Sequence, residues 1–503
     1  MHGEGTPDSR KLGYLLGFIQ AQTGAHAIEA LDFRQLSGGA VQENHGLSVR
    51  MAGGTMAGER HFVVRCNAPA SLSASLGRAQ EFEVLRIAHH SGVRTPRPLW
   101  LCPGPNPLGG EFYVMNRVPG NAAARGLVKD DALTPDQRKS LMFQLGRNLA
   151  LLHRVEHSPG TLPFLPQPGT SPAQRRIQEC GQTLRRLGES HPAIELGLWH
   201  LGRHIPRDQA WVLCHGDFRT GNYLVDDGEL TAILDWEFAS WSDPYEDLGW
   251  MCARCWRFGH PEREAGGVGD KADLFAGYES LSGRRIDPRR VAYWELMACV
   301  RWATVALEQS HRHRSGQQES LELALTGRIL PEIQQDLMSH LRSFLASMEI
   351  VIPEAAGGSA PRIDEHRGGG SESIPPDLPD GSSLLRTARS LLLREILPIL
   401  PPERHYDARM IANAMDIAAR ELEIGEPILA AQGQAIAAFY RSLGLEPPAP
   451  ALSGLIADIQ HGSFSEAQQP ALCALIDTLL SLKLALSNPK RVGPGNRTGG
   501  DRG

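Results

Sequence analysis

The sequence predicts an α+β protein with a strand-rich first part, a mainly helical second part and a separate all-α helical bundle at the end. Strand candidates with alternating apolar residues surround glycine turns between residues 33 and 65. Helical spacing of apolar residues then dominates residues 133–155 and 247–347. Residues 352–382 are rich in glycine and proline, which is typical of a linker, and further amphipathic helices follow them.

Length and composition are those of a soluble globular protein with two or three domains. The chain has 503 residues, of which 41% are apolar and 21% charged. Its net charge of −6 argues against a nucleic-acid-binding surface. The first residues lack the pattern of a signal peptide, and Asp477 and Lys483 interrupt the apolar run 474–486, so we expect no membrane association. The eight scattered cysteines favour free thiols in the cytoplasm.

Local patterns predict the elements of the first part. Residues 1–30 contain a short helix, and residues 33–40 join a strand to a glycine turn. Two more strands, residues 47–50 and 61–65, lie on either side of a second glycine pair. Residues 75–91 have helical spacing. A plain hairpin turn explains either glycine pair when it is considered alone.

The most informative stretch runs from Val212 to Glu237. Residues 223–225 and 232–234 are apolar runs joined by an Asp-Asp-Gly turn, which predicts a β-hairpin. Asp217 and Asn222 precede this hairpin and Asp235 follows it, so two carboxylates and an amide should converge from adjacent loop ends. Such a set suits a Mg²⁺ site with a base beside it. Taken singly, each residue is more simply an ordinary loop residue.

The combination of these motifs resembles a known family. His215-Gly216-Asp217, with Asn222 five positions later and Ile233-Leu234-Asp235 after the hairpin, resembles the catalytic segment of the aminoglycoside phosphotransferase and choline kinase-like family. Residues 242–248 resemble the Gly-Asp-Pro-x-x-Asp-Leu motif of that family, with serine in place of the glycine. The resemblance covers about residues 30–345. It implies a bilobal protein-kinase-like fold with a β-rich N-lobe and a helical C-lobe.

The resemblance assigns a role to each polar residue of the stretch. Asp217 matches the catalytic aspartate that accepts the proton of the substrate hydroxyl, and Asn222 and Asp235 match the two Mg²⁺ ligands. His215 matches a residue that supports the catalytic loop. Asp243 and Asp247 match structural residues behind that loop.

The same resemblance implies a site for ATP. The residues expected there are the phosphate-facing positions Ser37, Gly38 and Gly39, the charged pair Arg65 and Glu81, and the hinge residues Met115, Asn116 and Arg117. Arg65 replaces the lysine of the family, and an arginine presents a planar fork instead of a point charge. The hinge backbone should bond the purine edge, and the resemblance alone favours ATP over GTP. An exposed helix glutamate is the alternative interpretation of Glu81.

For the substrate, the resemblance extends to an acyl-CoA-dehydrogenase-associated subfamily through residues 275–302. It favours a hydroxyl acceptor on a hydroxyacyl compound or hydroxyacyl-CoA, with Arg219 and Arg301 contacting its carboxylate or phosphate. An aminoglycoside acceptor is the first alternative, but arginines outnumber carboxylates in residues 173–203, which suits a polycation poorly. A non-catalytic pseudokinase that acts through its C-terminal helices is the second alternative. Arg65 favours it, and the intact Asp217, Asn222 and Asp235 argue against it.

The C-terminal helices resemble an uncharacterised helical domain that occurs beside such phosphotransferases. We expect it to serve docking, dimerisation or substrate presentation, through a homodimer or a partner from acyl-CoA metabolism. The predicted segments are an N-terminal helix (1–30), the N-lobe (31–118), the C-lobe (119–350), a linker (351–382), the helical bundle (383–490) and a disordered tail (491–503).

Overall fold

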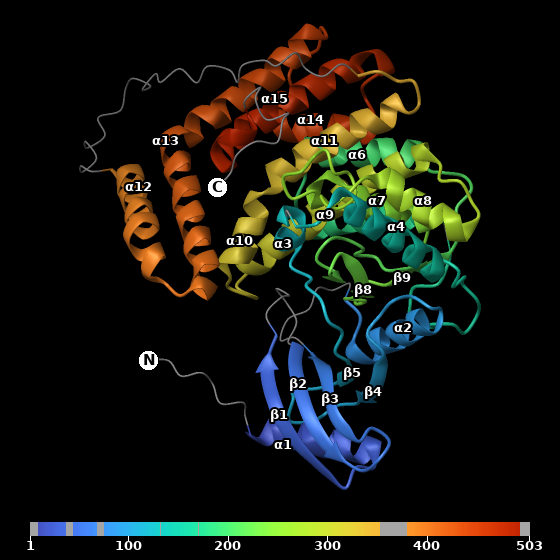
Figure 1. Ribbon diagram of the computed structural model, residues 1–503. Helices are drawn as coiled ribbons and strands as arrows, with labels where there is room; N and C mark the ends of the chain where they lie inside the picture. The colour runs from blue at the N-terminus through green and yellow to red at the C-terminus, as the bar shows by residue number, and fades with distance from the viewer. Residues whose placement is uncertain are drawn as a thin grey trace. The chain divides into compact units, whose positions relative to one another are not determined.

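The computed structural model describes residues 9–36, 44–67, 75–130, 132–169, 171–352 and 380–492 (Figure 1). The chain divides into two compact units. The first contains Met1–Ala173 and Arg207–Asp287, and the second contains Gln174–Pro206 and Pro288–Gly503. The predicted phosphate loop (Ser37, Gly38 and Gly39), most of the linker and most of the C-terminal tail lie outside the described residues.

The first unit begins with a five-stranded antiparallel sheet, as predicted for the N-lobe. Its strand order is β1-β2-β3-β5-β4. The strands are β1 (Ala27–Gln35), β2 (Asn44–Ala52), β3 (Gly58–Cys66), β4 (Pro98–Cys102) and β5 (Phe112–Asn116). Helix α1 (Ser9–Thr23) precedes the sheet and helix α2 (Arg78–His90) follows β3. The predicted hairpin around the second glycine pair is confirmed by the pairing of β2 with β3.

The alternation of side chains along β3 gives its two faces different neighbours. Phe62, Val64 and Cys66 belong to the hydrophobic core that includes Leu15 and Ile19 of α1. Successive side chains of a strand point to opposite faces, so the intervening Arg65 points away from this core. Its guanidinium reaches α2 on the other face of the sheet. The apolar pattern of β3 thereby determines which face of the sheet carries a cation.

The rest of the first unit holds short strands among helices. The helices are α3 (Ala124–Lys129), α4 (Pro135–Leu152), α7 (Pro244–Cys252), the short η1 (Arg254–Trp256) and α8 (Lys271–Ser282). The strands are β6 (Val212–Cys214), β7 (Tyr223–Asp226), β8 (Glu229–Ile233) and β9 (Ser240–Ser242), with β6 paired to β9 and β7 paired to β8. The β7–β8 pair confirms the hairpin predicted from the Asp-Asp-Gly turn. Asp227 and Gly228 both have positive φ, of 45° and 76°, as the tight turn requires.

The second unit is helical in all its described residues except for irregular connections. It contains α5 (Pro172–Leu187), α6 (Pro192–Arg203), α9 (Pro288–Arg314), α10 (Leu321–Arg328), α11 (Leu330–Ala346), α12 (Gly381–Leu391), α13 (His405–Ser442), α14 (Ala451–His461) and α15 (Gln469–Ser487). Five short helical segments connect or end them: η2 (Leu392–Ile396), η3 (Leu397–Ile399), η4 (Pro402–Arg404), η5 (Glu466–Gln468) and η6 (Pro489–Arg491). Although a proline usually interrupts a helix, α13 is continuous and contains Pro427. A proline inside a helix costs about 3 kcal/mol, and the packing of α13 against α12 and α15 offsets that cost.

The boundaries of the two compact units differ from those of the segments predicted from the sequence. Helix α15 packs against α11, and α14 packs against α6. Arg342 of α11 forms an ion pair with Asp477 of α15. The helices after the linker therefore share a unit with α6, α9 and α11, which the sequence assigned to the C-lobe. The segment Glu466–Ser487 is long and apolar enough to cross a membrane. A buried core helix meets the same criteria of length and composition.

Candidate active site

The candidate site is built from two loops of the first unit. The loop between β6 and β7 carries Asp217 and Asn222, and Asp235 lies two residues after the end of β8. The backbone N–H of Leu234 donates to the carbonyl of Asn222 at 2.8 Å, which joins the two loops. Gly216 has a φ of +79°, and a Cβ there would lie 2.1 Å from the carbonyl oxygen of Phe238. The glycine of the His-Gly-Asp motif is thus required by the backbone.

Asp217 is buried and accepts hydrogen bonds on both carboxylate oxygens. Its Oδ2 accepts from Nδ2 of Asn222 at 2.7 Å, and its Oδ1 accepts from Nε of Arg219 at 3.1 Å. Oδ1 also accepts from Nε1 of Trp250 at 2.8 Å. These donors fix the carboxylate in one orientation, as a general base requires. The sequence suggested Arg219 as a substrate contact and did not suggest Trp250, because no motif marks this tryptophan as a partner of Asp217.

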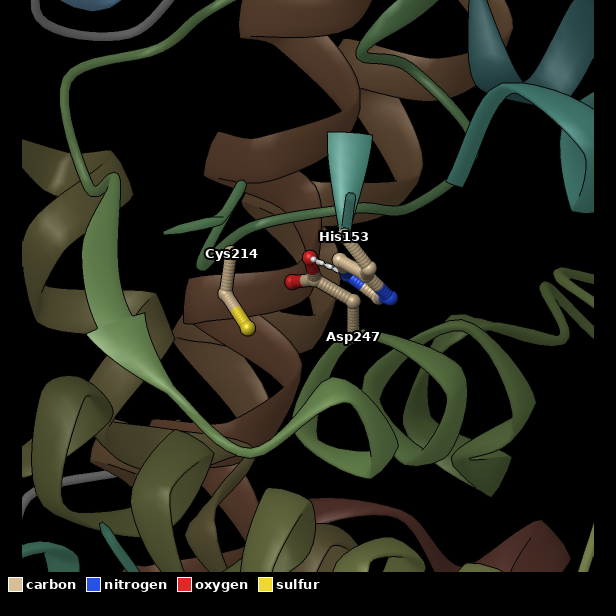
Figure 2. Close-up of side chains that lie close together, drawn as sticks. All are labelled: His153, Cys214 and Asp247. Atoms are coloured by element: carbon tan, nitrogen blue, oxygen red, sulfur yellow. Dashed lines mark hydrogen bonds and ion pairs between the residues drawn. The ribbon is translucent and has the colours of Figure 1, made fainter. Parts of the chain in front are cut away.

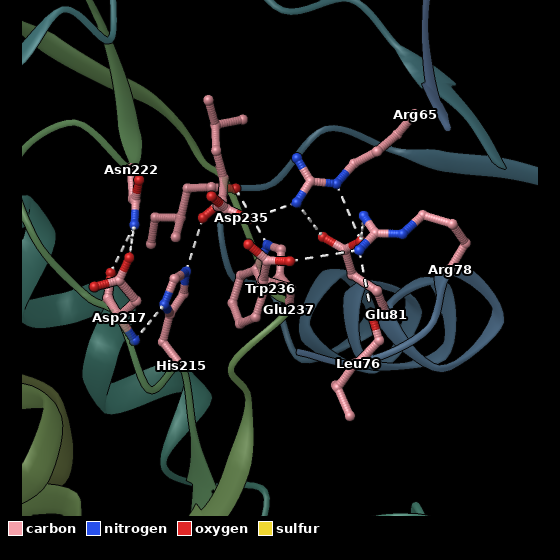
Figure 3. A network of polar contacts seen from close by, with 12 residues as sticks. Arg65, Leu76, Arg78, Glu81, His215, Asp217, Asn222, Asp235, Trp236 and Glu237 are labelled. Atoms are coloured by element: carbon pink, nitrogen blue, oxygen red, sulfur yellow. Dashed lines mark hydrogen bonds and ion pairs between the residues drawn. The ribbon is translucent and has the colours of Figure 1, made fainter. Parts of the chain in front are cut away.

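Asn222 and Asp235 each present an oxygen atom suited to a cation. The Asn222 amide donates to both the carbonyl and Oδ2 of Asp217, so its Oδ1 is directed away from them. Asp235 bonds Arg65 through Oδ1, and its Oδ2 has no hydrogen-bond partner in the described part of the chain (Figure 3). One amide and one carboxylate oxygen are ligands that Mg²⁺ accepts. The donor set therefore fits the predicted metal.

Arg65 bridges the two lobes of the candidate site. Its Nε donates to Oε2 of Glu81 at 3.0 Å, and its Nη2 forms ion pairs with Glu81 and Asp235. Burial alone would lower the pKa of Arg65, but the carboxylates of Glu81 and Asp235 raise it well above its ordinary value. Burial alone would raise the pKa of Asp235, and the Arg65 charge instead holds it below its ordinary value. Arg65 thus stays charged and keeps Asp235 ionised.

Two further charged residues extend this network and were not predicted. Arg78, at the first turn of α2, forms ion pairs with Glu81 and, at 3.5 Å, with Oε2 of Glu237. The backbone N–H of Leu76 donates to the carbonyl of Glu237 at 2.8 Å. Burial, and next the charge of Asp235, raise the pKa of Glu237 to about 7. The start of α2 is therefore tied to the segment that carries Asp235.

The residues predicted to support the catalytic loop lie behind it. Asp247 accepts the backbone N–H groups of His215 at 2.7 Å and Gly216 at 2.9 Å, and Nε2 of His153 at 3.1 Å. His215 Nε2 lies 2.8 Å from the carbonyl of Leu234. Asp243 caps helix α7 by accepting the backbone N–H of Tyr245.

His153, Cys214 and Asp247 also form a buried cluster that could in principle hold a metal ion (Figure 2). Nδ1 of His153, however, lies 3.1 Å from the hydroxyl of Tyr278, and its Nε2 bonds Asp247. Both ring nitrogens are therefore already engaged. The cluster is better explained as the hydrogen-bonded support of the catalytic loop.

The hinge stays a prediction, but the structure shows which of its backbone donors are already used. The backbone N–H of Asn116 donates to the carbonyl of Arg97, and that of Arg117 donates to the carbonyl of His61, both at 3.0 Å. These two N–H groups cannot donate to a purine without breaking a bond. The next N–H, that of Val118, has no hydrogen-bond partner among the described residues. The sequence did not single out this N–H group, because the strand register decides which backbone donors are already bonded.

The two predicted substrate-binding arginines belong to different units. Arg219 lies in the catalytic loop with its guanidinium 4.7 Å from the ring centre of Trp256. Arg301 lies on α9 in the second unit and is half-buried. A shared contact of both arginines with one substrate stays a prediction.

Comparison of the sequence with known proteins finds a phosphotransferase family over the residues that form this site. Residues 52–284 match the phosphotransferase enzyme family, and residues 398–491 match a domain of unknown function, DUF6285. Mouse (Mus musculus) acyl-CoA dehydrogenase family member 10 is 27% identical over 242 residues, which cover 47% of this chain and 21% of that protein. Rat (Rattus norvegicus) acyl-CoA dehydrogenase family member 11 is 30% identical over 203 residues, which cover 38% of this chain and 25% of that protein. The chain thus spans a quarter or less of the length of these curated relatives.

A solved structure shows the same fold. It belongs to a Ralstonia eutropha protein assigned as an aminoglycoside phosphotransferase, with 20% identity and a TM-score of 0.53. The similarity covers 66% of this chain and 98% of that one. The kinase-like fold predicted from the sequence, with an antiparallel N-lobe sheet and a helical C-lobe, is thereby confirmed.

Proposed function

We propose that this chain transfers a phosphoryl group from ATP to a hydroxyl group of a small molecule, with Mg²⁺, and the match of residues 52–284 to the phosphotransferase enzyme family supports this proposal. The observation that carries the proposal is the arrangement around Asp217. An oriented carboxylate lies beside two cation-binding oxygens, and the buried Arg65–Glu81 pair adjoins them. Phosphoryl transfer needs this kind of positioning and charge neutralisation more than covalent catalysis.

Each residue then has one task. Asp217 accepts the proton of the acceptor hydroxyl as the hydroxyl oxygen attacks the terminal phosphorus of ATP, and the bond from this phosphorus to the bridging oxygen breaks, so that ADP leaves. Asn222 and Asp235 would hold Mg²⁺, which would neutralise charge on the phosphates. Arg65 contributes a positive charge on the N-lobe side, and Glu81 keeps that charge in place. The N–H of Val118 is the backbone donor available to the purine edge.

For the acceptor, we propose a hydroxyacyl compound or a hydroxyacyl-CoA. The similarity to acyl-CoA dehydrogenase family members 10 and 11 supports this class, since those proteins are named for acyl-CoA chemistry. Arg219 supports it as well, because a cation beside the base suits an anionic acceptor. An aminoglycoside acceptor is the alternative suggested by the name of the similar Ralstonia protein. A cytoplasmic location is part of the proposal, and the eight free cysteines agree with it.

A non-catalytic pseudokinase is the competing function. Arg65 in place of lysine is the feature in its favour. Asp217, Asn222 and Asp235 argue against it, because a scaffold needs no oriented base next to two cation-binding oxygens. The ion pairs of Arg65 with Glu81 and Asp235 also support the catalytic alternative, because an arginine here keeps two carboxylate partners.

The test compares wild type with three aspartate-to-asparagine variants. We expect Mg-ATP to raise the melting temperature of wild type and to be slowly turned over. Asp235→Asn should lose the thermal shift, whereas Asp217→Asn should keep it and lose turnover by about 100-fold or more. Asp226→Asn, an exposed position of the same hairpin, is the matched control and should behave as wild type.

The same assay separates the alternatives. Acceleration of ATP turnover by hydroxyacyl-CoAs, and not by aminoglycosides, would support the proposed acceptor, and the reverse order would favour an aminoglycoside. If Mg-ATP neither stabilises the protein nor is turned over, the phosphotransferase function is wrong.

A further inference from the structure

The proposed base is held by a residue that no sequence motif identifies. Trp250, on helix α7, has only 4% of its surface exposed, and its indole Nε1–H donates to Oδ1 of Asp217 at 2.8 Å. An indole N–H can only donate a hydrogen bond. Trp250 therefore orients the carboxylate and cannot compete with it for the acceptor's proton.

A second tryptophan connects Trp250 to the other partner of the base. The rings of Trp250 and Trp256 lie 5.4 Å apart, and Trp256 is 6% exposed. The guanidinium carbon of Arg219 lies 4.7 Å from the ring centre of Trp256, within the range of a cation–π contact. Arg219 in turn donates to Oδ1 of Asp217. Trp256 thus contacts both donors of Asp217 Oδ1, which are the Trp250 indole and the Arg219 guanidinium.

This arrangement constrains where the acceptor can approach. Oδ1 already has two donors, and Oδ2 accepts from Asn222. A carboxylate bonded on both oxygens cannot rotate freely, so its remaining lone pairs have fixed directions. A rotation of the carboxylate would move the base away from the acceptor hydroxyl, and small misplacements of reacting groups cost on the order of 100-fold in rate.

We propose that Trp250 and Trp256 are positioning residues of the phosphoryl transfer. Trp250 fixes the orientation of the Asp217 carboxylate, and Trp256 keeps the Arg219 cation beside it. The inference rests on the proposed role of Asp217 as the base. Both rings lie at the proposed base, through the contacts with Asp217 and Arg219, so we expect them to act on the transfer step and not on ATP binding.

The kinetic test removes the indole N–H and keeps an aromatic ring. Trp250→Phe should lower kcat by about 10- to 100-fold, with an unchanged KM for ATP and an unchanged Mg-ATP thermal shift. Trp256→Leu should lower kcat to the same extent as Arg219→Gln. Trp241→Phe is the matched control, because this buried tryptophan of β9 contacts the ring of His157 and not the base, and it should keep the wild-type kcat.

A spectroscopic measurement tests the hydrogen bond without any turnover. Among the indole N–H resonances of the nine tryptophans, that of Trp250 should lie at low field and should shift the most to high field in Asp217→Asn. A neutral amide oxygen is a weaker acceptor than a carboxylate, which explains the direction. Because this measurement uses Asp217→Asn, it tests the hydrogen bond even if Trp250→Phe does not fold.

The outcomes are distinguishable. An unchanged kcat in Trp250→Phe, an equal loss in Trp241→Phe, or no indole shift in Asp217→Asn would each overturn the positioning role. A wild-type protein that does not turn over ATP would instead overturn the proposed function itself, and the positioning role with it.

Discussion

Arg65 occupies the position of a family lysine, and its contacts explain how a guanidinium serves there. Two nitrogen atoms of the fork bond the buried Glu81, and one of these also bonds Asp235. A lysine ammonium is a point charge and cannot match both oxygens of Glu81 in a plane. The side chain of Glu81 is completely buried, and Arg65 and Arg78 are its ion-pair partners there.

Removal of this charge should destabilise the N-lobe strongly. We expect Arg65→Met to lower the free energy of unfolding by about 3–5 kcal/mol, because it breaks a buried ion pair from one side. Arg65→Lys should recover part of this loss and keep the Mg-ATP thermal shift. Chemical denaturation of the variants measures both effects.

Arg50→Met provides the comparison for Arg65→Met. Arg50 is exposed on the neighbouring strand β2, where it pairs with the exposed Glu29. An exposed pair contributes at most about 1 kcal/mol, so this variant should be nearly as stable as wild type. Equal losses in both variants would show that the burial of the Arg65 network does not determine its contribution.

At the scale of elements, helices α4 and α8 approach each other through two glycines. A Cβ at Gly146 would lie 1.9 Å from the carbonyl oxygen of Leu274, and one at Gly277 would lie 2.1 Å from that of Phe143. The backbones therefore contact each other directly. This contact places α4, and with it the neighbouring His153, behind the catalytic loop.

A methyl group at this crossing should force the helices apart. We expect Gly146→Ala to lower the free energy of unfolding by about 3 kcal/mol, since the added atom meets backbone that cannot move aside. Gly433→Ala is the control, because no atom lies within 4 Å of the position of its Cβ in α13. There the better helix propensity of alanine should stabilise the protein by about 1 kcal/mol. A neutral Gly146→Ala, measured by thermal unfolding, would mean that α4 and α8 are not so closely packed.

Local signals were sufficient for much of the fold and for the centre of the site. The Asp-Asp-Gly turn predicted the β7–β8 hairpin, and the spacing of Asp217, Asn222 and Asp235 predicted that they converge. Ion pairs between residues far apart in the sequence were harder to predict. Glu81 was assigned only by resemblance, and an exposed helix residue was an equal alternative, yet it is completely buried.

Other features could not be predicted because they depend on how elements pack. Trp250, Arg78 and Glu237 join the site from helices and loops whose local patterns carry no chemical signal. The free N–H of Val118 depends on which strand carbonyls are already used. The continuous α13 passes through Pro427 because tertiary packing outweighs the local preference.

At the scale of the whole molecule, the C-terminal helices are part of a larger core. Helices α13, α14 and α15 share the second unit with α6, α9 and α11, although the sequence places a linker between the two sets. Leu337 and Leu341 of α11 are buried, and so are Ile476 and Leu480 of α15. The expectation of a homodimer, or of a partner from acyl-CoA metabolism, stays a prediction.

Removal of the C-terminal helices should therefore destabilise the predicted C-lobe. A chain ending at residue 350 exposes the face of α11 that packs against α15, so we expect a melting temperature several degrees lower than that of the full chain and binding of a hydrophobic dye. Scanning calorimetry gives the measurement. A truncated chain that melts at the wild-type temperature would show instead that residues 383–490 fold as an independent bundle.

The backbone at Asp235 has a consequence for the evolution of this chain. Its φ of +64° lies in the left-handed region, where asparagine and glycine are the residues accepted most readily besides aspartate. Asparagine differs from aspartate by a single base in the codon. Loss of the proposed metal site can therefore pass through asparagine or glycine without added backbone strain, whereas other replacements would add strain. Relatives that lack the proposed activity should carry asparagine or glycine at this position more often than alanine or glutamate.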